Sequence, residues 1–221
     1  MKNSGQYSKK IREFYRSPGL KNQKPEKVIY DEPVESLVYA IISENVTQGQ
    51  SNTIIHRLKE HFTDLNDLRV SRMDEIADVI GGDVQAATNT ASAIVKVLAS
   101  VFGRYNMVSL NALKKMGKRP ARQFLEKMEG VSRFAVDYCM LTALNGHAIP
   151  LTRKMVEYLK NNRMVYPDSD EQEIEGFLAR QISAENAYEF YALLRSQSES
   201  GKSEAKGKKK AVNKTKNKTG S

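Results

Sequence analysis

The sequence is poor in the residues that build metal and redox sites. It contains one cysteine, Cys139, and three histidines in 221 residues. One thiol cannot form an internal disulfide, hold an iron–sulfur cluster or complete a structural zinc site. The histidines are scattered without the spacing of metal ligands. We therefore expect no metal and no cofactor, and the apolar residues around Cys139 predict a small buried side chain.

Long apolar runs are also missing. No uninterrupted stretch approaches the roughly 18 residues of a membrane span, and the first residues lack the apolar segment of a secretory signal. Hydrophobic residues make up 40% and charged residues 28% of the chain, which is ordinary for a globular protein. We expect no membrane partner and, for a bacterial host only, a cytoplasmic location in the nucleoid.

Positive charge is concentrated at the two ends of the chain. Residues 201–221 carry eight lysines against Glu204, a net charge of +7, and the basic N-terminal segment 1–27 carries a net +6. Because the whole chain has a net charge of +9, residues 28–200 are acidic at −4. Segment 198–221 has almost no apolar content, which predicts a disordered Lys-rich tail. Such a tail binds phosphate backbones without sequence preference, or serves only as a solubilising extension.

Apolar residues recur at helical spacing through the middle of the chain, and long alternating β patterns are missing. The sequence therefore predicts an all-α domain over 28–197. The signals for its helices are Pro33 at one start, a Ser71-to-Asp74 capping box at another, Gly81-Gly82 and Gly103 at two ends, Pro120 in a first turn, Asp170 as a cap, and Ser183 at the start of the last helix.

A short joint, Gly130-Val131-Ser132, separates two segments that both read as helical. It is either an ordinary helix–helix turn or the hairpin of a helix-hairpin-helix motif. In the motif, N–H groups at the start of the second helix suit a phosphate, and glycine has no Cβ to obstruct a DNA strand. A basic island of seven Lys or Arg against two Glu runs from Lys114 to Arg133 and ends at this joint.

The wider sequence, from Pro33 to about Arg195, resembles the helix-hairpin-helix DNA glycosylase superfamily in its endonuclease III branch. MEGVSRFAV is similar to the family's LPGVGRKTA hairpin, IPLTRK to its PVDTH-like segment, and LVYAIISENVTQGQSN to its L-x-x-x-x-L-S-x-Q/N-x-T-D helix and loop. IEGFLARQISAENAYEFYALL looks like the family's closing helices. The resemblance implies two helical lobes with a cleft between them, one over 45–130 and the other over 28–44 plus 131–197.

The resemblance also implies which residues contact double-stranded DNA. They are the hairpin residues Gly130, Val131, Ser132 and Arg133, together with Lys127 and Asn45. Asn45 matches the family's Gln or Asn that fills the gap left by an extruded base. Ser132 stands where the family usually has a second glycine, and Glu129 stands where proline is common.

Two catalytic residues of the family are replaced in this sequence. The family's lysine, whose amine attacks the sugar C1′ and forms a Schiff base, corresponds to Phe134. The family's aspartate, whose charge supports loss of the base, corresponds to Thr152. We therefore predict no catalytic residue and no lyase step, and a pocket too blocked or too apolar for an extruded base. The family's four-cysteine cluster is absent as well.

Three functions remain open at this point. The chain is a pseudoenzyme that recognises damaged or distorted duplex DNA, or a working monofunctional glycosylase, or an interaction domain that no longer binds DNA. The second requires that Glu44, Asp137 or Glu157 replaces the missing aspartate. The first requires that the island from Lys114 to Arg133 lies beside the hairpin on one face.

Overall fold

The computed structural model describes residues 4–17 and 25–200. Within these ranges the fold is helical and contains no strand, so the predicted all-α class is confirmed. The α-helices are α1 (Ser4–Tyr15), α3 (Pro33–Ser43), α4 (Gln48–His61), α5 (Leu65–Val70), α6 (Met73–Ile80), α7 (Val84–Tyr105), α8 (Lys118–Glu126), α9 (Arg133–Thr142), α10 (Arg153–Asn161), α11 (Glu171–Gln181) and α12 (Ala187–Glu199), with 3₁₀ helices η1 (Asn111–Lys115) and η2 (Ala184–Asn186).

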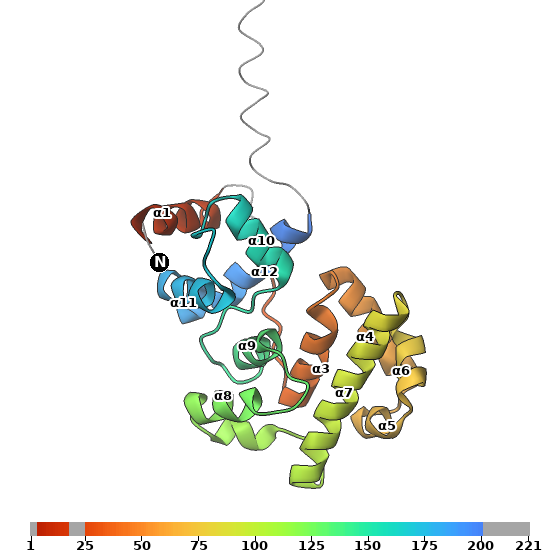
Figure 1. The fold of residues 1–221 in the computed structure, drawn as a ribbon. Helices are drawn as coiled ribbons and strands as arrows, with labels where there is room; N and C mark the ends of the chain where they lie inside the picture. The colour runs from red at the N-terminus through yellow and green to blue at the C-terminus, as the bar shows by residue number, and fades with distance from the viewer. Residues whose placement is uncertain (1–3, 18–24, 201–221) are drawn as a thin grey trace, which may run out of the picture.

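The helices gather into two groups (Figure 1). α4, α5, α6 and α7 lie on one side, and α1, α10, α11 and α12 lie on the other. α3 and α9 lie between the groups and pack against each other. The second group combines α1 with three helices from the C-terminal part of the chain. Two groups of helices agree with the predicted two-lobed fold, whereas the predicted lobe bounds, 45–130 and 28–44 plus 131–197, stay a prediction.

The two central helices are buried on nearly all sides. In α3 this follows from contacts with α4, α7 and α9, and a helix that is apolar all round is expected in such a place. Two of their buried polar groups are paired with each other, since the hydroxyls of Ser36 and Thr142 lie 2.8 Å apart. Cys139 of α9 is 0% exposed, as predicted, and burial raises the pKa of its thiol to about 12.

α7 is long and apolar enough, by length and composition alone, to cross a membrane. In the structure it packs against α3, α5 and α6. Its buried residues are Ala87, Ala91, Ile94, Val97, Leu98 and Val101. This apolar stripe lies in the protein core, so we assign α7 as a core helix.

The predicted capping box at Ser71 is wrong. Arg72 is the N-cap residue of α6 and makes no side-chain cap hydrogen bond. Ser71 Oγ instead donates to Asp67 O at 2.8 Å. Because α5 and α6 follow each other almost directly, Ser71 ends the first helix and does not begin the second.

Gly103 does not end α7, contrary to prediction. The helix continues to Tyr105 and stops at Asn106, whose φ of 53° is left-handed. Asparagine tolerates the left-handed conformation better than most residues, so Asn106 ends the helix where Gly103 was expected to end it. Gly81 ends α6 with φ 69° and the Asp170 side chain caps α11, both as predicted. Ser183 precedes the 3₁₀ helix η2 and does not start the last α-helix, because α12 begins at Ala187.

The folded part extends beyond the predicted domain, 28–197, at both ends. In α1, Ile11 and Phe14 are 0% and 3% exposed and belong to the core, because α1 packs against α11. At the other end α12 continues to Glu199, whose carboxylate is held in an ion pair with the preceding turn. Residues 201–221, for which a disordered tail is predicted, lie outside the described residues.

Candidate nucleic-acid interface

α8 and α9 are joined by a tight hairpin. Gly130 takes a φ of +83°, which glycine adopts without strain. Ser132 then caps α9, its hydroxyl accepting from Ala135 N at 3.1 Å. The amide groups of Ser132 and Arg133 stand at the start of a ten-residue helix, where the helix dipole is positive. The two helices and the turn of the predicted motif are therefore present.

Gly130 also allows the hairpin to approach α7 closely. A Cβ atom at this position would lie 3.1 Å from Ala93 O and 3.5 Å from both Lys96 Cβ and Val97 Cγ2. The first of these distances is shorter than an ordinary van der Waals contact. The glycine is thus required by packing inside the protein as well as by the turn itself.

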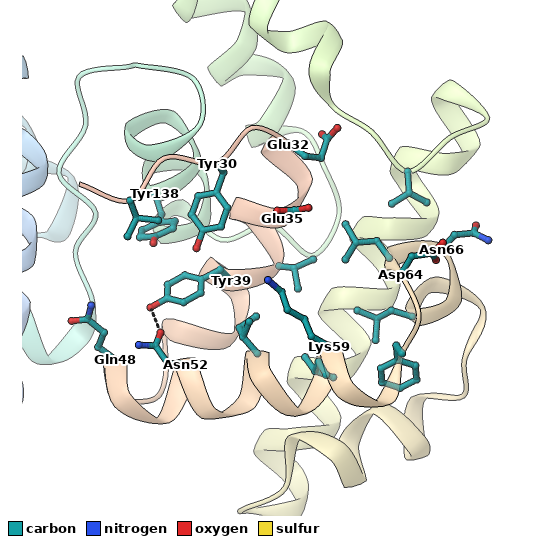
Figure 2. Close-up of a pocket in the computed structure, with 18 of the residues that line it drawn as sticks. Tyr30, Glu32, Glu35, Tyr39, Gln48, Asn52, Lys59, Asp64, Asn66 and Tyr138 are labelled. Carbon is teal, nitrogen blue, oxygen red and sulfur yellow. Dashed lines mark hydrogen bonds between the residues drawn. The ribbon is translucent and has the colours of Figure 1, made fainter. Parts of the chain in front are cut away.

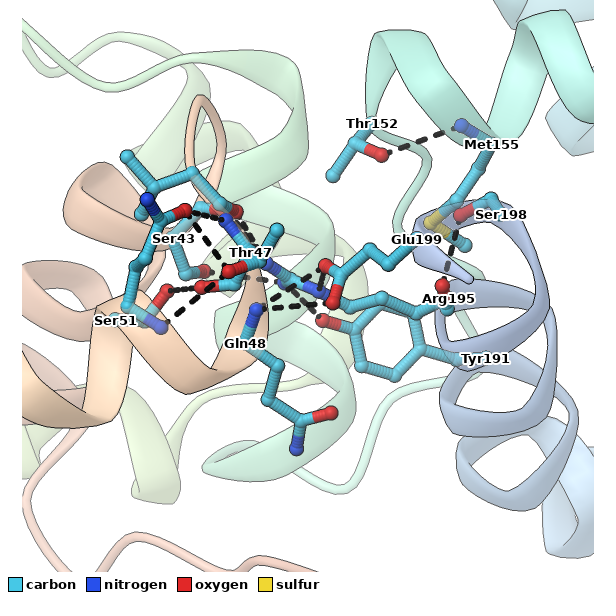
Figure 3. Close-up of polar contacts among 12 residues, drawn as sticks. Ser43, Thr47, Gln48, Ser51, Thr152, Met155, Tyr191, Arg195, Ser198 and Glu199 are labelled. Carbon is cyan, nitrogen blue, oxygen red and sulfur yellow. Dashed lines mark hydrogen bonds and ion pairs between the residues drawn. The ribbon is translucent and has the colours of Figure 1, made fainter. Parts of the chain in front are cut away.

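The two positions matched to catalytic residues are buried. Phe134 is 1% exposed, and its ring stacks on Tyr138 with centroids 6.0 Å apart. The Arg195 guanidinium lies 6.0 Å from the same ring centroid. Thr152 is 7% exposed, and its hydroxyl accepts from Met155 N at 3.3 Å as the cap of α10 (Figure 3). Neither position offers an amine or a carboxylate.

The basic island from Lys114 to Arg133 does not gather beside the hairpin. α8 has nine residues, and at 1.5 Å per residue such a helix is roughly 13 Å long. Lys118 begins it at the end away from the hairpin, where its ammonium donates to Leu144 O just beyond α9. Lys114 donates to a backbone carbonyl in the segment before α3. Only the later part of the island lies near the hairpin.

Two arginines of the island are paired with acids. Arg133 forms an ion pair with Glu175 of α11. Arg122 pairs with Asp137 at 2.6 Å and lies 3.9 Å from the Glu175 carboxylate. Asp137 is 2% exposed, and burial together with the nearby Glu175 raises its pKa to about 7. Both guanidinium groups are therefore already paired with carboxylates of the protein itself, although Arg133 lies at the surface.

Further carboxylates lie beside the hairpin. Ser132 Oγ donates to Glu44 Oε2 at 2.6 Å, and burial raises the pKa of Glu44 above its usual range. Glu129 pairs with Lys96 at 2.9 Å. Lys127 is exposed, and its side chain makes no ion pair within residues 4–17 and 25–200. The local charge around the hairpin is consequently mixed, with Lys127 available to an external anion.

Comparison with known proteins identifies the fold of this chain through solved structures. The sequence matches no protein-family model, and no curated protein matches it. A non-covalent endonuclease III–DNA complex is 20% identical, with a TM-score of 0.68 over 88% of this chain and 85% of that one. The chain has the helix-hairpin-helix DNA glycosylase fold. H. pylori 3-methyladenine DNA glycosylase MagIII bound to 1,N6-ethenoadenine has this fold as well, at 14% identity and a TM-score of 0.63, with coverage of 89% and 97%.

A third solved structure with this fold is similar to the chain over a comparable span. It is the Clostridium acetobutylicum 8-oxoguanine glycosylase/lyase in complex with double-stranded DNA, 16% identical with a TM-score of 0.64. The match covers 90% of this chain and 71% of that chain. At these identities the likeness establishes the glycosylase fold, and the chemistry has to be argued from the residues of this chain.

Within this glycosylase fold, Asn45 lies on an exposed loop between α3 and α4. Its side chain makes no hydrogen bond in the described part of the chain, and Glu44 is the C-cap residue of α3. Arg195 of α12 is hydrogen-bonded to the backbone of this loop: it donates to Ser43 O at 2.7 Å and to Val46 O at 3.0 Å (Figure 3). Asn45 is therefore free to contact a partner, on a backbone that is fixed on both sides.

The three acids considered as replacements for the aspartate of the glycosylase fold have different surroundings. Asp137 is enclosed with Arg122. Glu157 is exposed and pairs with Arg153 at 3.0 Å, one turn earlier on α10. Glu44 alone of the three is half-buried and bonded to the hairpin.

A cavity of about 840 Å³ opens between the segment before α3, α3 itself, α4, α5 and α12 (Figure 2). Its tyrosines are Tyr30, Tyr39, Tyr138, Tyr188 and Tyr191. The rings of Tyr39 and Tyr138 stack at 5.3 Å, and Tyr39 OH donates to Asn52 Oδ1 at 3.3 Å. Neither Phe134 nor Thr152 lines it. This cavity does not reach the two positions matched to catalytic residues, so the predicted pocket, too blocked or too apolar for an extruded base, stays a prediction.

Two further residues of the site, Arg195 and Glu199, are not among those predicted from the sequence. Both belong to α12, and Arg195 follows the apolar run Tyr191-Ala-Leu-Leu. A signal was available, because a basic residue followed by an acid four positions later is the spacing of an ion pair on one helix face. This spacing predicts the ion pair of Arg195 and Glu199, but it does not predict that the pair is hydrogen-bonded to the loop between α3 and α4.

Proposed function

We propose that this protein binds duplex DNA through its hairpin and recognises damaged or distorted sites without excising a base. One observation carries the proposal: the hairpin turn keeps its geometry while the two matched catalytic positions are buried and chemically inert. The hairpin offers amides at the start of α9 and the exposed Lys127. Asn45 stands on the exposed loop after α3. Solved structures with this fold include complexes with DNA.

The inert chemistry follows from the side chains. Phe134 has no nucleophile, so no Schiff base forms and no strand-cutting step follows. Thr152 has no negative charge with which to stabilise a cation-like sugar, and its hydroxyl already caps α10. Loss of such a carboxylate costs several kcal/mol of transition-state stabilisation, on the order of 10²–10⁴ in rate.

The sequence tied this function to a basic island gathered beside the hairpin, and that requirement is not met, so the positive charge for DNA binding has to come from other parts of the chain. The arginines beside the hairpin are paired, while strong positive charge lies in residues 1–27 and 201–221. We infer that the terminal segments supply most of the salt-dependent affinity and that the hairpin supplies orientation. Such a division separates general attraction to DNA from recognition of a site.

Two other functions are supported by single observations. Glu44, half-buried at the hairpin with a raised pKa, is the residue that would support a working monofunctional glycosylase. The pairing of Arg133 and Arg122 with carboxylates of the same chain would support a domain that no longer binds DNA. One set of experiments separates all three.

The test uses fluorescence anisotropy with three duplexes of one sequence: intact, mismatched and carrying an abasic-site analogue. We expect Lys127→Glu to weaken binding of all three severalfold, because it adds repulsion next to the hairpin. Lys115→Glu is the matched control, with the same charge change on η1 near the other end of the island. Equal losses in the two variants would show that the hairpin has no special part in binding.

Base release is measured in parallel on duplexes with oxidised, alkylated, deaminated or mismatched bases, followed by hot alkali. We expect no cleavage at any lesion. Release that disappears in Glu44→Gln would establish the monofunctional glycosylase. Failure of the full chain to bind any duplex at low salt would establish the interaction domain, and either result would overturn the proposal.

A further inference from the structure

Arg195 is among the largest fully buried side chains of the protein, at 1% exposure. A buried charge is destabilising unless it is paired and hydrogen-bonded. Each guanidinium nitrogen is bonded accordingly (Figure 3): Nε to Glu199 at 2.8 Å, Nη1 to Tyr191 OH at 2.8 Å, and Nη2 to the carbonyls of Ser43 and Val46. The cation is thus completely enclosed by acceptors, of which only Glu199 is charged.

The two carbonyl acceptors stand on either side of Asn45 in the sequence, Ser43 before it and Val46 after it. A single nitrogen, Nη2, donates to Ser43 O at 2.7 Å and to Val46 O at 3.0 Å. The distance between these two carbonyls is therefore set by one planar group, which has a rigid donor geometry. An apolar side chain of the same volume would fill the space without fixing the loop.

Glu199 extends the contact to the far end of the same loop. Its two carboxylate oxygens each accept from the backbone N–H of Gln48 at 3.1 Å. Gln48 is the first residue of α4, where a negative charge is favourable because of the helix dipole. Arg195 and Glu199 together bond α12 to both ends of the segment from Ser43 to Gln48 (Figure 3).

We propose that Arg195, held by Glu199, is a positioning residue that fixes the loop of residues 44–47 so that Asn45 faces DNA. The inference rests on the proposed function, because it assigns Asn45 a contact with DNA. A positioning role explains why the ion pair of Arg195 and Glu199 is buried here. Stability alone does not explain it, since buried ion pairs are often less stabilising than apolar residues of similar volume. The ion pair restricts the loop to a single conformation, and this fixes the orientation of the exposed Asn45 side-chain amide.

The first test requires no DNA. In Arg195→Met, amide hydrogen exchange of residues 44–48 is expected to be about tenfold faster or more, as for the loss of a charge-assisted hydrogen bond. Exchange in the middle of α7 should remain as in the wild type. Tyr191→Phe is the matched control, because it removes one hydrogen bond of Arg195 and none of the loop. Unchanged protection of 44–48 in Arg195→Met would overturn the proposal.

The second test is a double-mutant cycle on recognition. The measured quantity is the ratio of affinities for the abasic-analogue duplex and the intact duplex. Asn45→Ala and Arg195→Met should each lower this ratio severalfold, and the double variant should lower it no further. The salt dependence of binding to intact duplex should stay the same in all variants, since the terminal basic segments are untouched.

The outcomes distinguish the two proposals. If the wild type discriminates between the duplexes and Arg195→Met discriminates equally well, the positioning role is wrong and DNA binding stands. Additive effects in the double variant also overturn the positioning role. If the wild type binds no duplex, the proposed function fails and the assignment of Asn45 fails with it. Where Arg195→Met does not fold, Glu199→Gln replaces it, and the faster exchange is then expected at Gln48.

Discussion

The hairpin offers a substitution whose effect can be divided into two physical contributions. Gly130→Ala adds a single methyl group at a φ of +83°. The left-handed backbone disfavours any residue with a Cβ, by about 1–2 kcal/mol. The new Cβ would also lie 3.1 Å from Ala93 O of α7, and overpacking of this kind costs a further 1–3 kcal/mol, roughly.

Gly82 provides the control that separates these contributions. Its φ is +85°, almost the same, and a Cβ there would meet nothing within 4 Å. Gly82→Ala should therefore show the backbone contribution alone. Gly130→Ala should lower the free energy of unfolding by about 2–5 kcal/mol in total, the excess over Gly82→Ala being the contact with α7.

The assay is urea unfolding followed by far-ultraviolet circular dichroism, with all variants at one protein concentration. A change in the midpoint at constant slope reports a change in stability. Equal destabilisation by the two substitutions would refute the reasoning, because it would mean that the hairpin moves away from α7 at no cost. In that case the glycine would be required by the turn alone.

Further predictions concern single contacts. Ser132→Ala removes the cap of α9 and should lower the free energy of unfolding by about 1 kcal/mol in urea. Asp137 has its pKa raised to about 7, so wild-type stability should fall relative to Asp137→Asn as the pH rises from about 4 to about 7 in thermal unfolding. Glu175→Gln frees Arg133, which should strengthen DNA binding and steepen its salt slope by about 0.9. Truncation after Ser200, which removes eight lysines, should reduce affinity for intact duplex and flatten the slope without loss of stability.

The last two of these predictions, which concern DNA binding, have a clear contrary result. Glu173→Gln, on an exposed residue of the same helix as Glu175, is the charge-matched control. Equal strengthening of DNA binding by both would mean that net charge matters and the release of Arg133 does not. An unchanged salt slope after truncation would show that residues 201–221 take no part in binding. The truncation starts after Ser200 because Glu199 is bonded to α4.

The helices and the hairpin could be predicted because their causes are local. Apolar periodicity, Gly81 and Asp170 act within one or two turns, and the structure places them as expected. Ser71 and Gly103 were misassigned for a reason that is also local: two helices share one junction at Ser71, and Asn106 takes the left-handed conformation in place of the glycine.

The charges of the site could not be predicted in the same way. Arg133 counts as an available cation in the sequence, but its partner Glu175 is 42 positions away. The bond between Ser132 and Glu44 joins residues 88 positions apart. No periodicity or spacing contains such pairs, because they depend on how α3, α9 and α11 are placed around one another. Arg195 is the extreme case, since two of its acceptors, the carbonyls of Ser43 and Val46, lie 152 and 149 positions away in the sequence.

The bonds from Arg195 to Ser43 and Val46 also have a consequence for synthesis. They join residues 149 and 152 positions apart, and α1 likewise packs on a helix, α11, made late in the chain. Translation at about 5–20 residues per second separates the two ends by on the order of 10 s. For that interval the apolar surface of α3 has emerged from the ribosome before α9 and α12 exist to cover it. The nascent protein is therefore expected to depend on chaperones until its last helix has been made.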